Sequence, residues 1–282
     1  MSDGPSRLST VANVVRLLFW VLLIFMLLSQ WVGTASLEKK RSAVIEEIQK
    51  TRGNRVITLI HREETVNLLG MAVSKYIDID DAEAVLRAIR LTPAKKPIDL
   101  IIHTPGGLVL AASQIAHALR AHEGKITVFI PHYAMSGGTL IALAADEIVM
   151  DPNAVLGPVD PQIGDLPAAS IIKTVELKKP EHVDDRTLIL ADMSAKAINQ
   201  ITSLVTTLLE KHLPRERAEE VAILISTGQF THDFPITVER AKSVGLPVST
   251  DMPTSIYSLM DLYPQRGVGR PSVNYIPLPR PS

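Results

Sequence analysis

The chain has 282 residues, of which 46% are hydrophobic and 21% are charged, and its formal net charge at pH 7 is −1. This length suffices for one α/β domain with appended segments. No basic run is long enough to follow a nucleic-acid backbone, which excludes a nucleic-acid-binding protein. The lack of cysteine excludes disulfides, a thiol nucleophile and cysteine-based metal sites. No HExxH motif or similar histidine cluster occurs, so we expect neither a metal nor a cofactor.

The first segments predict a short tail and a membrane anchor. Residues 1–16 form the expected tail, and from Leu17 to Leu37 no residue is charged. An apolar helix of this length crosses a bilayer of about 30 Å. Trp20 and Trp31 are placed as interfacial anchors towards its two ends. A cleaved signal peptide is the alternative, but the run is long for one, and the charged Glu38–Arg41 follows as a stop-transfer signal.

The charges around the span predict its orientation. Three positive residues follow it and two precede it, which favours a cytoplasmic main domain under the positive-inside rule. Residues 38–54 indicate a stalk or amphipathic helix, residues 55–263 the main domain, and residues 264–282 a proline-rich flexible tail. We therefore expect a single-pass protein of the cell membrane.

Strands and helices alternate along the main domain. Short β-branched runs predict the strands, and the segments between them predict crossover helices, the first capped by Asp80. This order implies an α/β fold with a mainly parallel sheet covered on both faces. Regularity falls between Leu156 and Arg186, where prolines interrupt the pattern. The predicted strands are Arg55–Arg62, Asp99–His103 and Ile126–Pro131, and the predicted helices are Asp81–Leu91, Leu108–His122, Thr139–Ala145, Met193–His212 and Arg215–Thr227.

Ser136 lies at a sharp junction between an apolar strand and a small-residue helix whose first turn is SGG. A serine on such a turn exposes its hydroxyl at the end of a sheet. Beside it are backbone N–H groups that the first helical turn leaves without partners. The position suits a nucleophile, although an ordinary N-cap explains this stretch alone equally well.

A second compact turn, with the sequence TPGG, follows the preceding predicted strand. In a parallel sheet both turns fall on the carboxyl-terminal edge, where open α/β sheets bind ligands. The amides of Gly106 and Gly107 then face Ser136, and with the Gly137 amide they bind the oxyanion of a tetrahedral intermediate. A plain type II turn explains TPGG alone. Two such turns about one βα unit apart favour the catalytic interpretation.

From Arg55 to Ser249 the chain resembles the ClpP/crotonase superfamily, on the sequences LIHR, YIDIDDAEAVLRAI, DLIIHTPGG, YAMSGGTLIALAADEIVMD and VLGPVDPQ. Within it, the chain is similar to signal peptide peptidase A and ClpP-like serine peptidases, and most similar to the membrane-anchored serine dehydrogenase proteinase family. The resemblance implies a ClpP/crotonase-like parallel-sheet βαβ fold, Ser136 as nucleophile, an oxyanion hole of Gly106 or Gly107 with Gly137, and a homo-oligomeric ring or dome. No GxGxxG motif occurs, so the family name implies no nicotinamide chemistry.

The same resemblance directs the choice of general base. In ClpP a histidine follows the serine within the segment similar to Val155–Pro161, and this chain has none there. That departure favours the Ser-Lys dyad of the signal peptide peptidase A branch, whose lysine needs a pKa lowered by burial or nearby positive charge. Lys196 fits best, because small and apolar residues flank it and the following segment resembles the region after that branch's catalytic lysine.

Several other groups compete with Lys196. Three of them, Lys173, Lys178 and Lys179, lie in a mixed polar stretch that is typical of solvated surface lysines. His132 is close to Ser136 but at a strand end, and His103 is typical of a buried histidine with a backbone partner. Asp160 and Asp192 can orient a lysine or bind a substrate amine, although capping or surface roles are usual for them. The competing bases are Lys173, Lys178, Lys179, His103 and His132.

Together these features predict a membrane-anchored serine endopeptidase that takes extended segments of membrane-associated or unfolded polypeptides. The chain has no Walker A motif, so ATP-driven unfolding would need a separate ATPase or membrane partner. Two alternatives stay open. A crotonase-type acyl-CoA enzyme needs a carboxylate at the substrate α-carbon in place of Ser136. A catalytically idle oligomeric membrane scaffold uses the same fold without the dyad.

Overall fold

The computed structural model describes residues 7–61 and 76–263 of the chain. The chain divides into two compact units, Met1–Glu47 and Ile48–Ser282. The second unit begins earlier than the predicted Arg55, because Ile48 is buried with only 1% of its surface exposed. The predicted tail at residues 264–282 lies outside the described residues.

Helix α1 (Arg7–Arg52) contains both the predicted anchor and the predicted stalk. It corrects two boundaries: residues 7–16 are helical instead of a tail, and no break separates the anchor from the stalk. The helix is continuous because no proline interrupts it, and it ends before Gly53, whose φ of +72° stops helical geometry. Over the residues that the structure describes, no helix combines the length and hydropathy needed to span a membrane.

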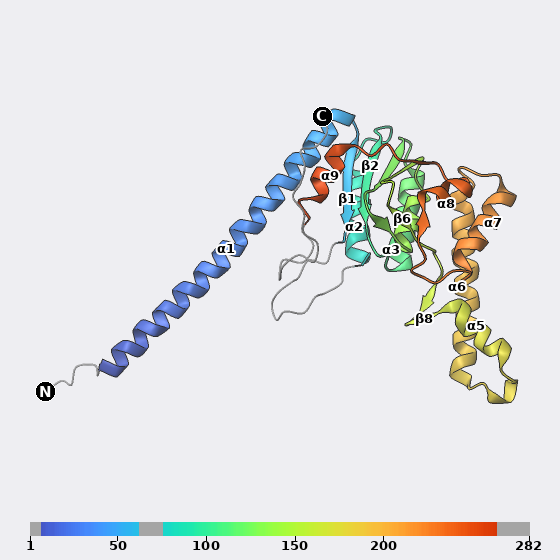
Figure 1. The fold of residues 1–282 in the computed structure, drawn as a ribbon, viewed down its shortest axis with the longest axis horizontal. Coiled ribbons are helices and arrows are strands. Elements are labelled where there is room, and N and C mark those ends of the chain that lie inside the picture. Colours follow the sequence, from blue (N-terminus) through green and yellow to red (C-terminus); the bar gives the residue numbers. More distant parts are fainter. Residues whose placement is uncertain (1–6, 62–75, 264–282) are drawn as a thin grey trace. The chain divides into compact units, whose positions relative to one another are not determined.

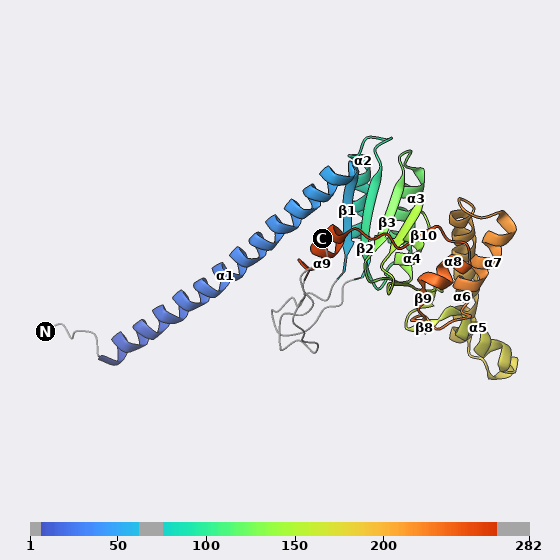
Figure 2. The same ribbon diagram turned by 45° about the horizontal axis from the view of Figure 1, so that its top comes forward.

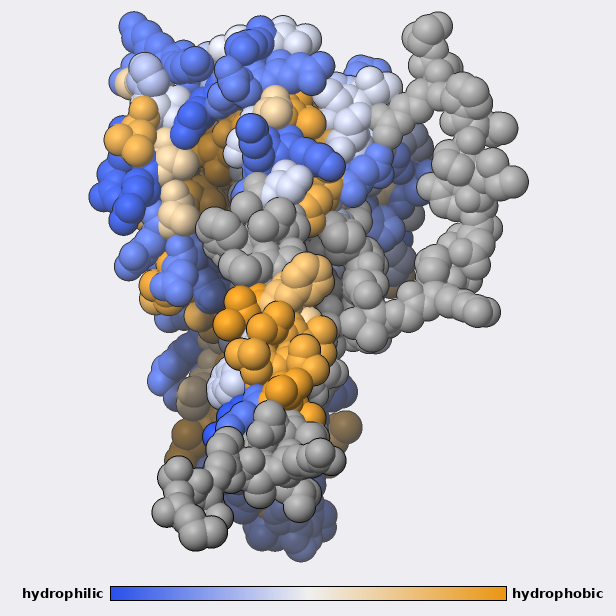
Figure 3. Space-filling model, turned by 90° about the vertical axis from the view of Figure 1, so that its left-hand side faces the viewer, coloured by the Kyte–Doolittle hydropathy of each residue, from blue (hydrophilic) through white to orange (hydrophobic). Residues whose placement is uncertain are grey.

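The described side chains near the start of α1 form an exposed apolar surface, which appears as the orange patch in Figure 3. Each of its large hydrophobic residues is more than half exposed. They are Val14, Val15, Leu17, Leu18, Phe19, Trp20, Val21, Leu22, Ile24, Phe25 and Met26.

The centre of the second unit is a five-stranded sheet in the order β1-β2-β3-β5-β10, with every neighbouring pair parallel. Figures 1 and 2 show these strands side by side. The predicted parallel sheet is therefore confirmed. Its strands are β1 (Arg55–Ile60), β2 (Ile98–His103), β3 (Ile126–Ile130), β5 (Glu147–Met150) and β10 (Val248–Ser249).

Every residue of β2 and β3 is buried, so the sheet is covered on both faces there. Leu100 and Val128 belong to the main core cluster, which also holds apolar residues of the crossover helices α2 (Ile79–Arg90) and α3 (Val109–Ala121). Continuous apolar runs are typical of strands buried in this way. The first helix is capped by Asp78 instead of the predicted Asp80, because Asp78 and Asp81 form a reciprocal capping box.

A second small sheet, in the order β4-β6-β9, continues from the carboxyl edge of the first. The segment expected to be irregular also contains a β7-β8 hairpin and a helix, and the helices α5, α6 and α7 pack as a group in both views (Figures 1 and 2). The remaining elements are β4 (Tyr133–Ala134), β6 (Val155–Leu156), β7 (Gln162–Ile163), β8 (Leu166–Pro167), β9 (Ile236–Thr237), α4 (Gly137–Ala142), α5 (Ala168–Leu177), a 3-10 helix (Pro180–His182), α6 (Asp185–Leu209), α7 (Arg215–Ser226), α8 (Val238–Ser243) and α9 (Thr254–Met260).

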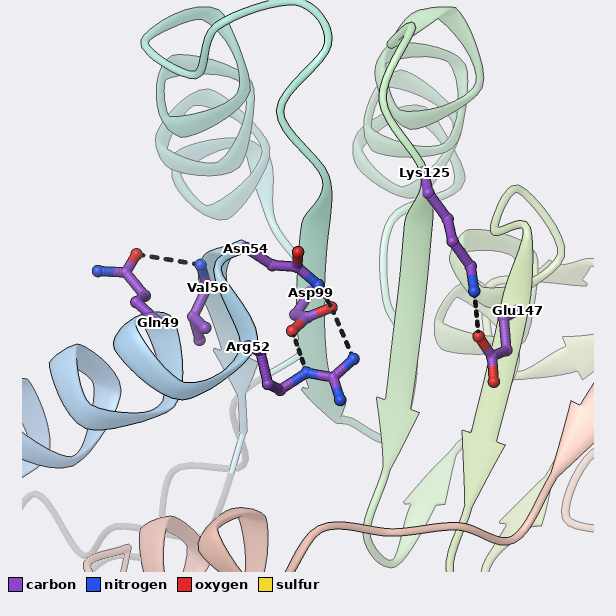
Figure 4. A network of polar contacts seen from close by, with 7 residues as sticks. All are labelled: Gln49, Arg52, Asn54, Val56, Asp99, Lys125 and Glu147. Atoms are coloured by element: carbon purple, nitrogen blue, oxygen red, sulfur yellow. Dashed lines mark hydrogen bonds and ion pairs between the residues drawn. The ribbon is translucent and has the colours of Figure 1, made fainter.

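A polar network fixes the end of α1 to the amino-terminal edge of the sheet (Figure 4). Arg52 Nε donates to a carboxylate oxygen of Asp99 at 2.5 Å, and Asn54 donates to the other oxygen at 2.9 Å. The Asp99 side chain is fully buried, and the Arg52 guanidinium also lies 4.8 Å from the ring centroid of Phe129. A buried charge of this kind requires its partners. The network therefore holds the last turn of α1 in a fixed position on β2 and β3.

Candidate active site

Two turns meet at the carboxyl edge of the sheet, one after β2 and one before α4. Backbone hydrogen bonds join them directly: Thr104 N–H donates to Tyr133 O at 3.2 Å, and Met135 N–H donates to Thr104 O at 3.0 Å. The two turns predicted from the sequence are thus adjacent, as parallel topology requires.

Ser136 has the backbone geometry of a sharp strand-to-helix turn. Its φ is +48° and its ψ is −112°, and it is the one non-glycine residue with positive φ in the described part of the chain. Such a conformation costs an L-residue about 1–3 kcal/mol and is typical of functional sites. The Ser136 side chain makes no capping hydrogen bond to α4. Ser136 thus occupies the N-cap position of α4 without capping the helix through its side chain.

Gly106 and Gly107 are required by their surroundings as well as by their backbone angles. Their φ values are +108° and +156°. A Cβ on Gly106 would lie 2.8 Å from Ser136 Cβ and 3.2 Å from Gly137 N, and a Cβ on Gly107 would lie 2.3 Å from Ile77 O. No side chain fits at either position, so the backbone of this turn approaches Ser136 directly.

The amides of these glycines differ in their hydrogen bonding. Gly106 N–H donates to Thr104 Oγ1 at 3.2 Å. The amides of Gly107 and Gly137 have no hydrogen-bond partner among the described residues. They also lie near each other, since a Cβ on Gly137 would be 3.5 Å from Gly107 N. The geometry favours Gly107 over Gly106 as the partner of Gly137 in binding an oxyanion.

Lys196 lies on an exposed part of α6. Its Nζ is 2.5 Å from Asp192 Oδ2, four residues earlier, and the two side chains are 67% and 61% exposed. Across residues 7–61 and 76–263, no hydrogen bond joins Lys196 to Ser136. The structure therefore does not bring the predicted base to the predicted nucleophile, and the surface role considered for Asp192 is the one observed.

The competing bases occupy other places. The lysines at 173, 178 and 179 are exposed, and Lys173 is 3.8 Å from Glu176. His132 is exposed, and its ring stacks on that of the buried His103 with centroids 5.6 Å apart. These two histidines shape the strand ends beside the site.

One pair near this edge was missed by the sequence analysis. His232 Nδ1 is 2.8 Å from Asp160 Oδ1, and Gln162 Nε2 donates to the other carboxylate oxygen at 2.7 Å. Asp160 is only 4% exposed. Its hydrogen bond raises the pKa of His232 above the ordinary value, against the opposing effect of burial. Asp160 follows β6 and His232 precedes β9, which are antiparallel neighbours, so strand pairing rather than local sequence brings them together.

No group of three or more histidine, aspartate or glutamate side chains suited to a metal ion occurs within the described ranges. The candidate site consists of a serine hydroxyl and backbone amides, which can attack and polarise a carbonyl group.

Comparison with known proteins agrees with this chemistry. The family model of ClpP-like SDH-type serine proteinases matches residues 6–282. Uncharacterized protein MJ0137 of Methanocaldococcus jannaschii is 52% identical over 266 residues, which cover 94% of this chain and 93% of the relative. Uncharacterized protein MJ1495 of the same organism is 56% identical over 240 residues, covering 85% and 82%. Among solved structures, ClpP1 from Listeria monocytogenes aligns with a TM-score of 0.46 and 16% identity, covering 73% of this chain and 96% of that one. The chain belongs to the ClpP-like SDH-type serine proteinases.

Proposed function

We propose that this serine proteinase is an endopeptidase in which Ser136 is the nucleophile and the Gly107 and Gly137 amides form the oxyanion hole. The observation that carries the proposal is the strained backbone of Ser136 beside two amides that have no partner among the described residues. Gly137 is buried and Gly107 is exposed, so the cost of an amide without a partner applies to Gly137, and an incoming oxyanion supplies an acceptor for both amides.

The proposed reaction has two stages. Ser136 Oγ attacks the peptide carbonyl carbon while the general base takes the hydroxyl proton, and the carbonyl oxygen becomes an oxyanion that accepts hydrogen bonds from the two amides. Collapse of this intermediate breaks the C–N bond, and the leaving amine receives the proton from the base. Water then attacks the acyl-enzyme by the same steps in reverse and releases the carboxylic acid and the free serine.

We propose Lys196 as the general base on one condition. An ammonium group has no lone pair to accept a proton, so Lys196 must leave the ion pair with Asp192 and lose its own proton before it can act. Its Nζ must then reach Ser136 Oγ, in the same subunit or from a neighbouring one, in surroundings that lower the pKa of the lysine. His232 is the competing base, because the buried Asp160 carboxylate binds Nδ1 and thereby orients the ring.

A polypeptide substrate fits the surface next to the oxyanion hole. Leu108, Val109 and Leu110 follow Gly107 directly and are 46%, 49% and 62% exposed. Adjacent exposed apolar side chains at a catalytic edge suit the side chains of an extended peptide segment. This surface supports a polypeptide over a small polar substrate.

The proposal includes anchoring to the cell membrane through Leu17–Leu37, with the peptidase domain on the cytoplasmic side. The support is the uncharged sequence of this segment and the charged Glu38–Arg41 after it. Anchoring directs the enzyme to membrane proteins or to unfolded chains near the bilayer. The proposal also includes assembly into a homo-oligomer. It further includes a separate ATPase or membrane partner that delivers folded substrates.

The test uses the full chain in detergent, a fluorophosphonate probe and an unfolded casein-like substrate. Ser136→Ala is expected to lose both labelling and cleavage, whereas Ser203→Ala, at an exposed serine of α6, keeps both. Loss in Lys196→Ala with retention in His232→Asn supports the lysine base, and the reverse result transfers the role to His232. Wild-type protein that neither labels nor cleaves any polypeptide contradicts the endopeptidase. Cleavage of an acyl-CoA would then support the crotonase-type alternative. Absence of both activities would support the catalytically idle scaffold.

A further inference from the structure

Two buried polar side chains lie behind the TPGG turn, on the side away from the exposed Gly107. His61 directly follows β1 and Thr104 directly follows β2, and they are 7% and 0% exposed. The parallel pairing of β1 with β2 continues into them, because His61 N–H donates to His103 O at 2.7 Å. Strand register therefore places the imidazole of His61 beside the hydroxyl of Thr104.

The two side chains belong to one hydrogen-bonded chain. His61 Nδ1 lies 2.8 Å from Thr104 Oγ1, and His61 Nε2 lies 3.1 Å from Asp81 Oδ2. The same carboxylate oxygen accepts the Asp78 N–H at 3.0 Å within the capping box of α2. The chain thus connects the amino end of α2 with the turn that precedes α3.

The direction of each hydrogen bond follows from the groups involved. A carboxylate only accepts, so Nε2 of His61 carries the proton towards Asp81, and Nδ1 of a neutral ring is then an acceptor. In this tautomer Thr104 O–H donates to Nδ1, with Gly106 O at 3.3 Å as the alternative acceptor of the same proton, and the oxygen lone pairs of Thr104 accept the Gly106 N–H at 3.2 Å. Thr104 thus occupies the Gly106 N–H, and His61 and Asp81 orient the Thr104 hydroxyl.

We propose, resting on the proposed function above, that Thr104 and His61 are positioning residues for the oxyanion hole. Thr104, whose hydroxyl His61 orients, binds the Gly106 N–H and so turns the next peptide to present the Gly107 N–H towards Ser136. Ile77 holds the same turn from another side, since it donates to Gly106 O at 2.7 Å and accepts the Leu108 N–H at 2.8 Å. Neither bond uses the Gly107 N–H, and the first holds the carbonyl of the same peptide group.

Thr104 also has a backbone role that a side-chain substitution leaves intact. Its N–H and C=O pair with Tyr133 and Met135 and hold the two turns together. Removing only the hydroxyl therefore releases the Gly106 amide without separating the turns. Thr104→Val keeps the shape of the side chain and the backbone hydrogen bonds and removes only the hydroxyl, so it is the informative variant.

The experiment compares Thr104→Val, Thr104→Ser and Thr206→Val in the full chain. Thr206 is a matched control on α6, because it is also buried, at 8% exposure, and its hydroxyl also makes a hydrogen bond, to the carbonyl oxygen of Thr202. Measured quantities are the rate of fluorophosphonate labelling, the kcat and KM for an unfolded polypeptide, and the unfolding temperature. We expect Thr104→Val to lower kcat and labelling about 10- to 100-fold with little change in KM, since misplacing one oxyanion donor weakens mainly the transition state. Thr104→Ser and Thr206→Val keep rates near wild type.

Three results overturn the positioning role while the proposed peptidase stands. They are wild-type labelling rates in Thr104→Val, an equal loss in Thr104→Ser, and a rise in KM with kcat unchanged. The positioning role is supported if Thr104→Val and Thr206→Val lower the unfolding temperature equally and only Thr104→Val loses activity. Absence of labelling in the wild-type protein contradicts the proposed peptidase itself, and the positioning role with it.

Discussion

A Cβ on Gly106 would lie 2.8 Å from the Cβ of Ser136, so the TPGG turn and the serine turn are in direct contact. Real Cβ atoms do not approach so closely. The TPGG turn must therefore have no side chain at position 106, so that the serine turn can present its hydroxyl. The contact joins two segments that are separate in sequence, and the first prediction depends on it.

Gly106→Ala is expected to reduce fluorophosphonate labelling at least about 100-fold, because the added methyl group displaces Ser136 and the Gly137 amide. Gly53→Ala is the control, since Gly53 also has positive φ but nothing within 4 Å of its Cβ position. Both variants lose about 1 kcal/mol of stability from backbone strain. Equal labelling in the two would contradict the contact.

Ser136→Gly is expected to be more stable than Ser136→Ala, although neither variant cleaves substrate. Glycine adopts the φ of +48° without strain, whereas alanine keeps the strain of the serine. The difference in free energy of unfolding should be about 1 kcal/mol, because relief of strain exceeds the entropic cost of glycine. Denaturant unfolding of the two inactive variants measures it. If Ser136→Ala is the more stable of the two, the turn is not strained.

The pair of His232 with Asp160 predicts a pH-dependent stability. The hydrogen bond to Asp160 raises the folded-state pKa of His232 above its unfolded value, despite the opposing effect of burial. Its stabilising contribution is therefore complete below the unfolded pKa of about 6.5 and is lost as pH rises through the raised folded pKa.

The measurement is the difference in free energy of unfolding between wild type and His232→Asn across that pH range. The difference should be larger on the acidic side than well above neutrality. His182→Asn, at an exposed histidine of the 3-10 helix, serves as the control and should show a smaller pH dependence. A difference that stays constant with pH would exclude protonation of His232 as the cause.

Local patterns predicted much of the fold. The strand β2 and the helices α3 and α7 lie within one residue of their predicted limits, because each has its own apolar period. The helix α5 was missed, since its neighbouring prolines appeared to break the segment. They bracket it instead: the helix begins directly after Pro167 and ends before Pro180.

For the candidate site as well, local sequence patterns predicted some residues, and contacts distant in sequence determine the others. Ser136 and the two glycines of TPGG were found because the strand–turn–helix pattern is local. The hydrogen-bonded chain through His61 and Thr104 was not, because those residues are far apart in sequence and meet only through strand register. The general base depends on tertiary geometry in the same manner, which is why Lys196 stays a prediction.

Arg52→Met is expected to destabilise the peptidase unit by about 3 kcal/mol, because it leaves the fully buried carboxylate of Asp99 with only Asn54 as a side-chain partner. The matched control is Lys125→Met, since the ion pair between Lys125 and Glu147 lies at the same sheet edge (Figure 4), but its side chains are 58% and 34% exposed. Exposed pairs contribute about 0–1 kcal/mol. Denaturant unfolding of both variants measures the difference. If the two lose the same stability, burial of Asp99 does not govern the strength of the contact between the last turn of α1 and the sheet.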